Sequence, residues 1–239
     1  MAAYCQSLNR SNRYYLLETP RAYAREKLDE AGERAALERR HAQYFRDYFE
    51  RAPDDWLRIS DAAWRATYAH ECDNVRAALD WAFGAEGDAA LGTGLAGASG
   101  SLWLELSLHG EGRRHIDTAI ARIGADTPAI DQARLRLLLG MLQTFSVPTE
   151  AAAALEHAID LYHHLGDPVG LGSSLVAKGL ILTLMARFGE AASMFAEALP
   201  LLERGGATKA LARHFAFSGH LKKARTQRGA RATARAAAR

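Results

Sequence analysis

Two kinds of residue cluster carry the side chains that cofactor or metal chemistry uses. Residues 92–97 read GTGLAG and match the dinucleotide pattern G-x-G-x-x-G, in which backbone amides cradle a pyrophosphate between a strand and a helix. No strand is indicated before this stretch, and small residues surround it, so we interpret it as a place of close helix packing. The ATP-binding pattern G-x-x-x-x-G-K-[ST] does not occur in the sequence.

The second kind combines histidine with acidic residues. His157, Asp160 and His164 follow at i, i+3 and i+7 and share one helix face. A metal centre needs three or four convergent ligands, and a polar, solvated face explains this spacing better. The run His70-Glu71-Cys72-Asp73 has ligand types, but consecutive helix side chains point apart, which favours a helix junction. We assign no catalytic, cofactor-binding or metal-binding residue, and we expect no enzyme activity.

The composition favours an all-helical protein of the cytoplasm. Alanine and leucine dominate, and only 6 of 239 residues are proline. The two cysteines, Cys5 and Cys72, are far apart in sequence and indicate neither a disulfide framework nor a zinc site. The N-terminus lacks the pattern of a secretory signal, and no apolar run is long enough to cross a membrane. We therefore expect no membrane partner.

The net charge of +2 conceals an uneven distribution. Residues 204–239 contain ten lysines or arginines and no acidic residue, whereas the whole chain has 30 basic and 28 acidic residues. Residues 1–203 therefore have a net charge of −8. Such a basic tail could bind nucleic acid weakly and without sequence specificity, by neutralising phosphates.

Residues 172–205 carry the clearest structural pattern. Gly179 is followed after 12, 16 and 19 residues by Ala191, Phe195 and Ala198. This spacing is typical of a tetratricopeptide helix pair, in which small residues let two antiparallel helices approach closely. We expect Phe195 to fill the gap between this pair and its neighbour.

The same pattern recurs upstream at intervals of 40 and 39 residues. Gly100 starts a first unit with identical offsets, and Gly140 starts a second with offsets of 11, 15 and 18. The shorter offsets indicate a shorter loop near residues 146–148, with Thr149 as a helix cap. The positions that complete these units are Gly112, Ile116, Ala119, Ala151, Leu155 and Ala158.

The chain has different patterns at its two ends. A fourth unit starts at Thr208, with Ala212, Phe215 and Gly219 inward, but its second helix has arginine where apolar and small residues are needed. We expect frayed helix or disorder from residue 222 onward, and self-association through the uncovered flank. Near the N-terminus we expect a strand at 13–18, a helix from Thr19-Pro20 to Gly32, and helices at 33–51, 56–70 and 75–83, the last capped by Asp73-Asn74.

Four segments of the chain carry a family resemblance: residues 13–33, 38–52, 72–84 and 102–122. Together they resemble the region that follows the ATPase module in bacterial STAND-type signalling ATPases, a family that includes winged-helix and LuxR-type transcriptional regulators. In that family the strand at 13–18 would end a winged-helix module, and the next helix would lead into a helical sensor. The resemblance covers roughly residues 13–204 and implies ATP binding only in an upstream module, because the family's ATP-binding and DNA-contacting residues have no counterpart here.

We therefore predict an all-α fold, a tetratricopeptide-like solenoid of helical hairpins with an N-terminal helical connector. The predicted function is that of a non-catalytic regulatory or protein-interaction module, a truncated sensor region that binds a protein or peptide on its repeats. The alternatives are a stand-alone tetratricopeptide adaptor and a small metal-dependent enzyme that uses His157 and His164. The predicted domains are 1–18 (winged-helix remnant), 19–87 (connector), 88–207 (repeats) and 208–239 (incomplete repeat and basic tail).

Overall fold

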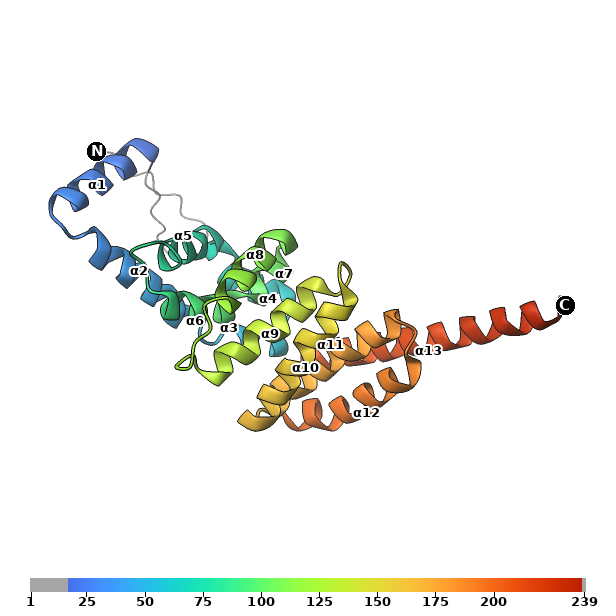
Figure 1. Cartoon of the computed structure of the whole chain (residues 1–239). Helices are drawn as coiled ribbons and strands as arrows, with labels where there is room; N and C mark the ends of the chain where they lie inside the picture. Colours follow the sequence, from blue (N-terminus) through green and yellow to red (C-terminus); the bar gives the residue numbers. More distant parts are fainter. Residues whose placement is uncertain (1–16, 238–239) are drawn as a thin grey trace.

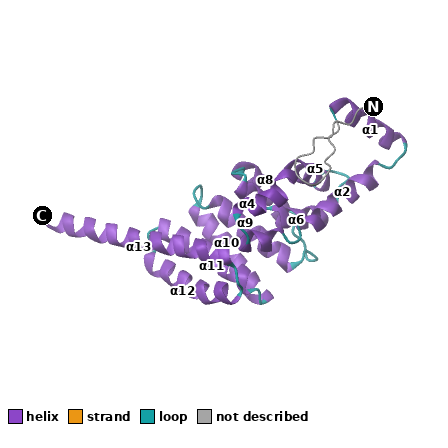
Figure 2. Ribbon diagram, turned by 180° about the vertical axis from the view of Figure 1, so that it is seen from behind, coloured by secondary structure: helices purple, strands orange, loops and turns teal. Residues whose placement is uncertain are grey.

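The computed structural model of the chain describes residues 17–237 (Figure 1). All regular structure in this range is helical, as Figure 2 shows, which confirms the predicted all-α class for this part of the chain. None of the helices in it is long and apolar enough to span a bilayer. The helices are α1 (Glu18–Glu30), α2 (Arg34–Tyr48), α3 (Ala52–Arg58), α4 (Asp61–Tyr68), α5 (Cys72–Ala82), α6 (Ala89–Ser99), α7 (Ser101–Glu105), α8 (His109–Ile120), α9 (Ala129–Gln143), α10 (Pro148–Leu165), α11 (Pro168–Leu184), α12 (Phe188–Arg204) and α13 (Thr208–Ala237).

From α6 onward the helices form an array of hairpins. Helix α9 pairs with α10, and α11 pairs with α12, and each hairpin packs against the next (Figure 1). Helices α6, α9, α11 and α13 contact one another in this order and form the inner layer of the array. Helices α8, α10 and α12 pack on this layer from the other side.

Glycine lets the paired helices approach closely. A Cβ atom at Gly140 would lie 2.5 Å from Cγ of Leu155, and one at Gly179 would lie 2.9 Å from the ring of Phe195. Leu155 and Phe195 are buried and lie on the second helix of the same hairpin, at the predicted offsets. The predicted close approach of the two helices at these glycines is therefore confirmed for these two units.

The close contact at Gly140 gives a first prediction. Gly140→Val is expected to destabilise the protein by about 1–3 kcal/mol, because the added side chain would overlap Leu155 and force the two helices apart. Urea denaturation followed by circular dichroism measures the change. Gly189→Val is the matched control, since no atom lies within 4 Å of the Cβ position at Gly189. An equal loss in both variants would contradict close packing as the cause.

The first predicted unit is built differently. The helix breaks at Gly100, between α6 and α7, and a Cβ there would meet Leu138 of α9 at 2.1 Å rather than Ile116. A Cβ at Gly112 would instead lie 2.4 Å from Cβ of Trp103, which is fully buried. The predicted equivalence of Gly100 with the glycines of the later units is wrong, because this unit accommodates a buried tryptophan with Gly112.

The helix predicted at 56–70 is two helices, α3 and α4, followed by a 3₁₀ turn at Ala69–Glu71. Ile59 ends α3 with extended backbone angles, φ −98° and ψ 165°. The Ser60 side chain then accepts a hydrogen bond from the backbone amide of Ala63 and starts α4. A serine cap of this kind competes with helix continuation, so it separates the two helices.

Three predicted helix starts are wrong. Thr19, the pair Asp73-Asn74, and Thr149 all lie inside the first turns of their helices, and none of these helices has a side-chain cap hydrogen bond. The amide of Asn74 donates instead to the carboxylate of Glu71 (2.6 Å). Of the predicted strand, residues 13–16 lie outside the described residues, Leu17 precedes α1, and the final position begins α1.

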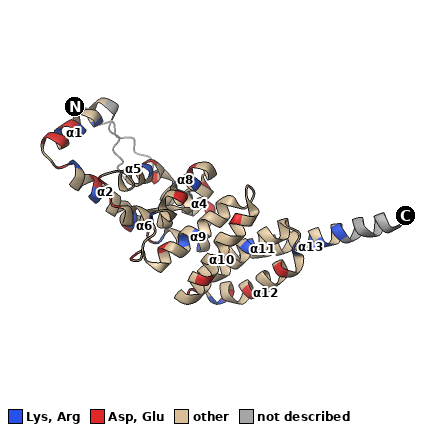
Figure 3. Ribbon diagram, viewed as in Figure 1, with Lys and Arg blue, Asp and Glu red and all other residues tan. Residues whose placement is uncertain are grey.

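Helix α13 replaces the predicted fourth hairpin. It runs to Ala237 as one helix, without the turn that a second helix would require, because alanine and arginine both favour helix. Its buried residues include His214 and Leu221, whereas Phe215 is 59% exposed. The predicted inward register was therefore wrong. Of the two states expected from residue 222 onward, frayed helix or disorder, the structure has helix through residue 237. Figure 3 shows lysine and arginine on the nearer part of this helix, and Figure 1 shows that the helix extends beyond the array.

The connector and the array share one hydrophobic core, which runs from Ala42 in α2 to Leu221 in α13. Helix α2 packs on α5 and α6, and α3 contacts α6, α7 and α13. The connector therefore folds back so that α3 lies against the inner layer of the array. This placement creates the site described next.

Candidate functional site

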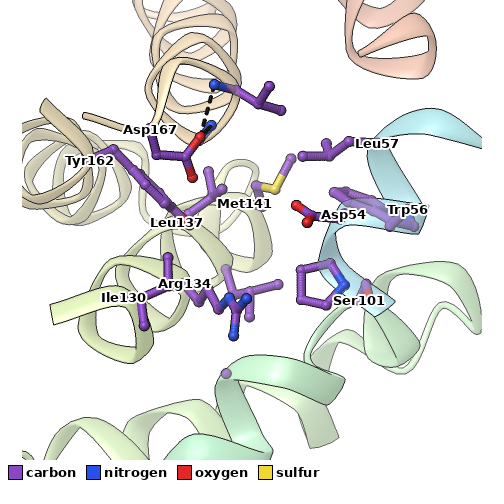
Figure 4. A pocket seen from close by; sticks show the side chains of 15 residues that line it. Asp54, Trp56, Leu57, Ser101, Ile130, Arg134, Leu137, Met141, Tyr162 and Asp167 are labelled. Carbon is purple, nitrogen blue, oxygen red and sulfur yellow. Dashed lines mark hydrogen bonds between the residues drawn. The ribbon is translucent and has the colours of Figure 1, made fainter. Parts of the chain in front are cut away.

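A pocket lies between α3 and the inner layer of the array (Figure 4). In this view α3 forms one wall, α9 lies in the middle, and the end of α10 with the start of α11 forms the opposite wall. The pocket has a cavity volume of about 60 Å³, and its empty space is about 580 Å³ when the open mouth is included. A buried water needs roughly 10–15 Å³ of cavity volume. The pocket can therefore hold a ligand group the size of one side chain.

Most of the lining is apolar, as in small-ligand sites generally. Trp56 and Leu57 come from α3 and face residues of α9 across the pocket (Figure 4). Trp56 and Leu57 are each 7% exposed, so their contribution to the pocket is held rigidly by the core. The further apolar lining residues are Ile130, Leu137, Leu138, Met141 and Val169.

Three polar side chains in the lining make no hydrogen bond or ion pair with the described residues: Asp54, Ser101 and Tyr162. Ser101 and Tyr162 are each 4% exposed, and the Ser101 hydroxyl is fully enclosed without a partner. Asp54 lies beside Trp56 and is exposed toward the pocket mouth (Figure 4). Burial raises the pKa of Tyr162, and the nearby carboxylates of Asp167 and Asp54 add to this rise, against the opposing effect of Arg134.

The positive charge of Arg134 is already balanced by an ion cluster behind the pocket. Its Nη1 lies 3.4 Å from Oε1 of Glu50 and 3.7 Å from Oδ1 of Asp131. Arg46 pairs with the same two carboxylates, and its Nη2 lies 3.6 Å from Oδ1 of Asp131. Two arginines and two carboxylates therefore neutralise one another, and Asp54 is left outside this cluster.

One tryptophan and three charged residues next to the pocket join α13 to the connector. We name this group, which consists of Trp56, Glu105, Lys209 and Arg213, the Trp56 clasp. The indole Nε1–H of Trp56 donates to Oε1 of Glu105 (2.6 Å), and Lys209 donates to the same oxygen (2.9 Å). The guanidinium carbon of Arg213 lies 3.9 Å from the Trp56 ring centroid, a cation–π contact. Burial lowers the pKa of Arg213 to about 10.

The candidates from sequence lie elsewhere. Residues 92–97 lie within α6, where a Cβ at Gly92 would be 2.9 Å from Cβ of Ala82 and one at Gly94 would be 2.7 Å from Nε of Arg46. Their interpretation as close helix packing is confirmed. Residues 70–73 form the predicted helix junction, between the 3₁₀ turn and α5.

The histidine face of α10 does not converge on a metal site. His157 and His164 are exposed, and Nδ1 of His164 lies 2.7 Å from the backbone oxygen of Asp160. Across the part of the chain that the structure describes, no three His, Cys, Asp or Glu residues are grouped so that they could hold a metal ion.

The sequence did not single out Asp54, Ser101 or Tyr162 as site residues. They come from three distant segments, and each fits a local helix pattern, so no local signal marks them. Comparison of the chain with protein-family models, with curated proteins and with solved structures yields no match. The interpretation of the pocket therefore depends on the geometry of the chain itself.

Proposed function

We propose that this chain is a non-catalytic regulatory module that binds a protein or peptide partner on the inner side of its helical array. The observation that carries the proposal is the pocket itself, whose rigid apolar walls hold three polar side chains that make no hydrogen bond or ion pair with the described residues, the Ser101 hydroxyl among them being fully enclosed. Helical-repeat arrays commonly bind partners on such inner surfaces. The resemblance of residues 13–204 to the sensor region of ATPase-type transcriptional regulators supports a regulatory role.

The position of α3 supports a link between binding and regulation. A ligand in the pocket would contact both α3, which belongs to the connector, and α9 and α11, which belong to the array. A ligand shifts a conformational equilibrium only if it binds one arrangement better than the other. Because the pocket exists only while α3 lies against the array, its occupancy would favour this docked arrangement. In the family, the ATPase module would precede the connector.

The test is selection of peptides from a library of bacterial proteome fragments on the full chain, followed by affinity measurements with variants. Met141→Lys places a charge in the pocket, whereas Met194→Lys places the same charge on α12, at a residue that is also partly buried. We expect Met141→Lys to weaken the selected peptides at least tenfold and Met194→Lys to change them less than twofold. Failure to select any peptide, or equal losses in both variants, would refute the proposal.

The selected sequences also distinguish the regulatory role from that of a stand-alone adaptor. Fragments of proteins that carry an ATP-binding G-x-x-x-x-G-K-[ST] pattern would support a module that works with a signalling ATPase. Fragments of proteins without this pattern would support an adaptor and contradict the regulatory part of the proposal.

A further inference from the structure

The charges around the pocket do not balance. Arg134, the one basic residue among the described lining residues, is already engaged by Glu50 and Asp131. Asp54 has neither an ion pair nor a hydrogen bond within the described part of the chain. Asp167 also lines the pocket, and its Oδ1 accepts hydrogen bonds from the amides of Val169 and Gly170 (3.0 Å each). These amides hold a carboxylate oriented at the pocket wall.

Two hydroxyl groups in the pocket also lack a partner. Ser101 and Tyr162 are each 4% exposed, and neither hydroxyl bonds to a described residue. Of the two, the Ser101 hydroxyl is the one that is fully enclosed. A buried polar group without a partner costs about 1–3 kcal/mol, so a ligand that supplies one is favoured. Hydroxyl and carboxylate oxygens both accept hydrogen bonds from N–H donors. Ammonium and guanidinium groups carry several such donors and no acceptor.

The apolar walls define the rest of the ligand. Leu137 and Met141 lie between the two carboxylates, and Trp56 and Leu57 of α3 line the wall on the Asp54 side (Figure 4). Lysine and arginine side chains bury their aliphatic stems on apolar surface while the charged end finds a polar partner. The volume of the pocket limits the ligand to about one such side chain.

We infer that the pocket binds a lysine or arginine side chain of the partner, with Asp54 as its counter-charge and the hydroxyls of Ser101 and Tyr162 as hydrogen-bond acceptors. This inference deepens the proposed function and rests on it. It assigns Asp54 a role in partner recognition that the fold does not require, because the side chain is exposed and pairs with none of the described residues.

The test uses n-butylguanidinium as a probe and the full chain, followed by ¹H–¹⁵N NMR. The reporter is the indole N–H of Trp56, identified by its loss in Trp56→Phe. We expect saturable shifts with n-butylguanidinium, and at least tenfold weaker binding of n-butylurea, which has a similar shape without the charge. Asp54→Asn should weaken the guanidinium at least fivefold. Asp126→Asn is the matched control, since Asp126 is exposed in the loop before α9 and away from the pocket lining, and it should change affinity less than twofold.

Several outcomes would overturn the inference. These are equal binding of n-butylurea and n-butylguanidinium, tighter binding of pentanoate than of the cation, and an unchanged affinity in Asp54→Asn. Selected peptides that depend on Met141 but not on Asp54 would also overturn it, while leaving the proposed function intact. Guanidinium binding that is lost in Asp54→Asn, together with failure to select any peptide, would support the pocket chemistry and refute the proposed function.

Discussion

Phe195→Ala is expected to lower the free energy of unfolding by about 3–5 kcal/mol. Phe195 is 3% exposed and lies where three helices meet. On one side its ring contacts the space that Gly179 leaves open on α11. On the other side it meets the His214 ring of α13 edge to face, with centroids 5.7 Å apart. Removing the ring leaves a cavity that the surrounding helices can close only by giving up their contacts with one another.

Urea denaturation followed by circular dichroism at equilibrium measures this loss. Phe145→Ala provides the control, because Phe145 is 81% exposed and its truncation should change stability by less than about 0.5 kcal/mol. A loss below about 1 kcal/mol for Phe195→Ala would show that the ring does not hold the last hairpin to α13.

The hairpins around Gly140 and Gly179 could be predicted because their signal is local. A small residue on one helix faces a large one on the next, and their separation in sequence is set by the lengths of the helix and the loop. The spacing from Gly179 to Phe195 can therefore be recognised in the sequence alone. The same argument failed at Gly100, where the bulk of Trp103 shifted the close contact to Gly112. It also failed in α13, because intrinsic helix propensity continues one helix to Ala237, with no turn into a second helix.

The pocket could not be predicted from sequence for a different reason. It exists because α3 folds back on the inner layer, and this placement depends on contacts between residues that are far apart in the chain. Trp56 shows the problem most clearly. From the sequence it could be placed only at the start of a helix, whereas its partners Lys209 and Arg213 lie at the other end of the described chain. No periodicity or spacing in the sequence links these positions.

Glu105→Ala is expected to cost about 3 kcal/mol, because this carboxylate is the common acceptor of the Trp56 clasp. Its side chain is 7% exposed. It accepts hydrogen bonds from Trp56 (2.6 Å), from Nε of Arg65 (3.0 Å) and from Lys209 (2.9 Å). Without it, Trp56 and Arg65 lose this acceptor, and Lys209 keeps its ion pair with Asp61. The buried Arg213, whose Nη2 has no hydrogen-bond partner in the described chain, loses the larger of two carboxylate attractions and keeps that of Asp61.

One variant at this position separates the effect of charge from that of geometry, and a second variant elsewhere serves as the control. Glu105→Gln keeps an oxygen that can accept from Trp56, so it should lose less stability than Glu105→Ala. Glu190→Ala removes a carboxylate from an exposed pair with Arg187 and should leave the urea midpoint unchanged. Equal midpoints for Glu105→Ala and Glu190→Ala would show that the clasp does not hold α13.

The clasp also affects the pocket. Trp56 lines the pocket on one side and, on the other, a second and more open hollow beside α13. When Glu105 is replaced, the indole loses the hydrogen bond that fixes its ring between Arg213 and the pocket. We therefore expect Glu105→Ala to increase amide hydrogen exchange in the first turns of α13 and to weaken n-butylguanidinium binding, although Glu105 does not line the pocket. Faster exchange with unchanged binding would instead mean that the core around Leu57 holds the pocket wall without help from α13.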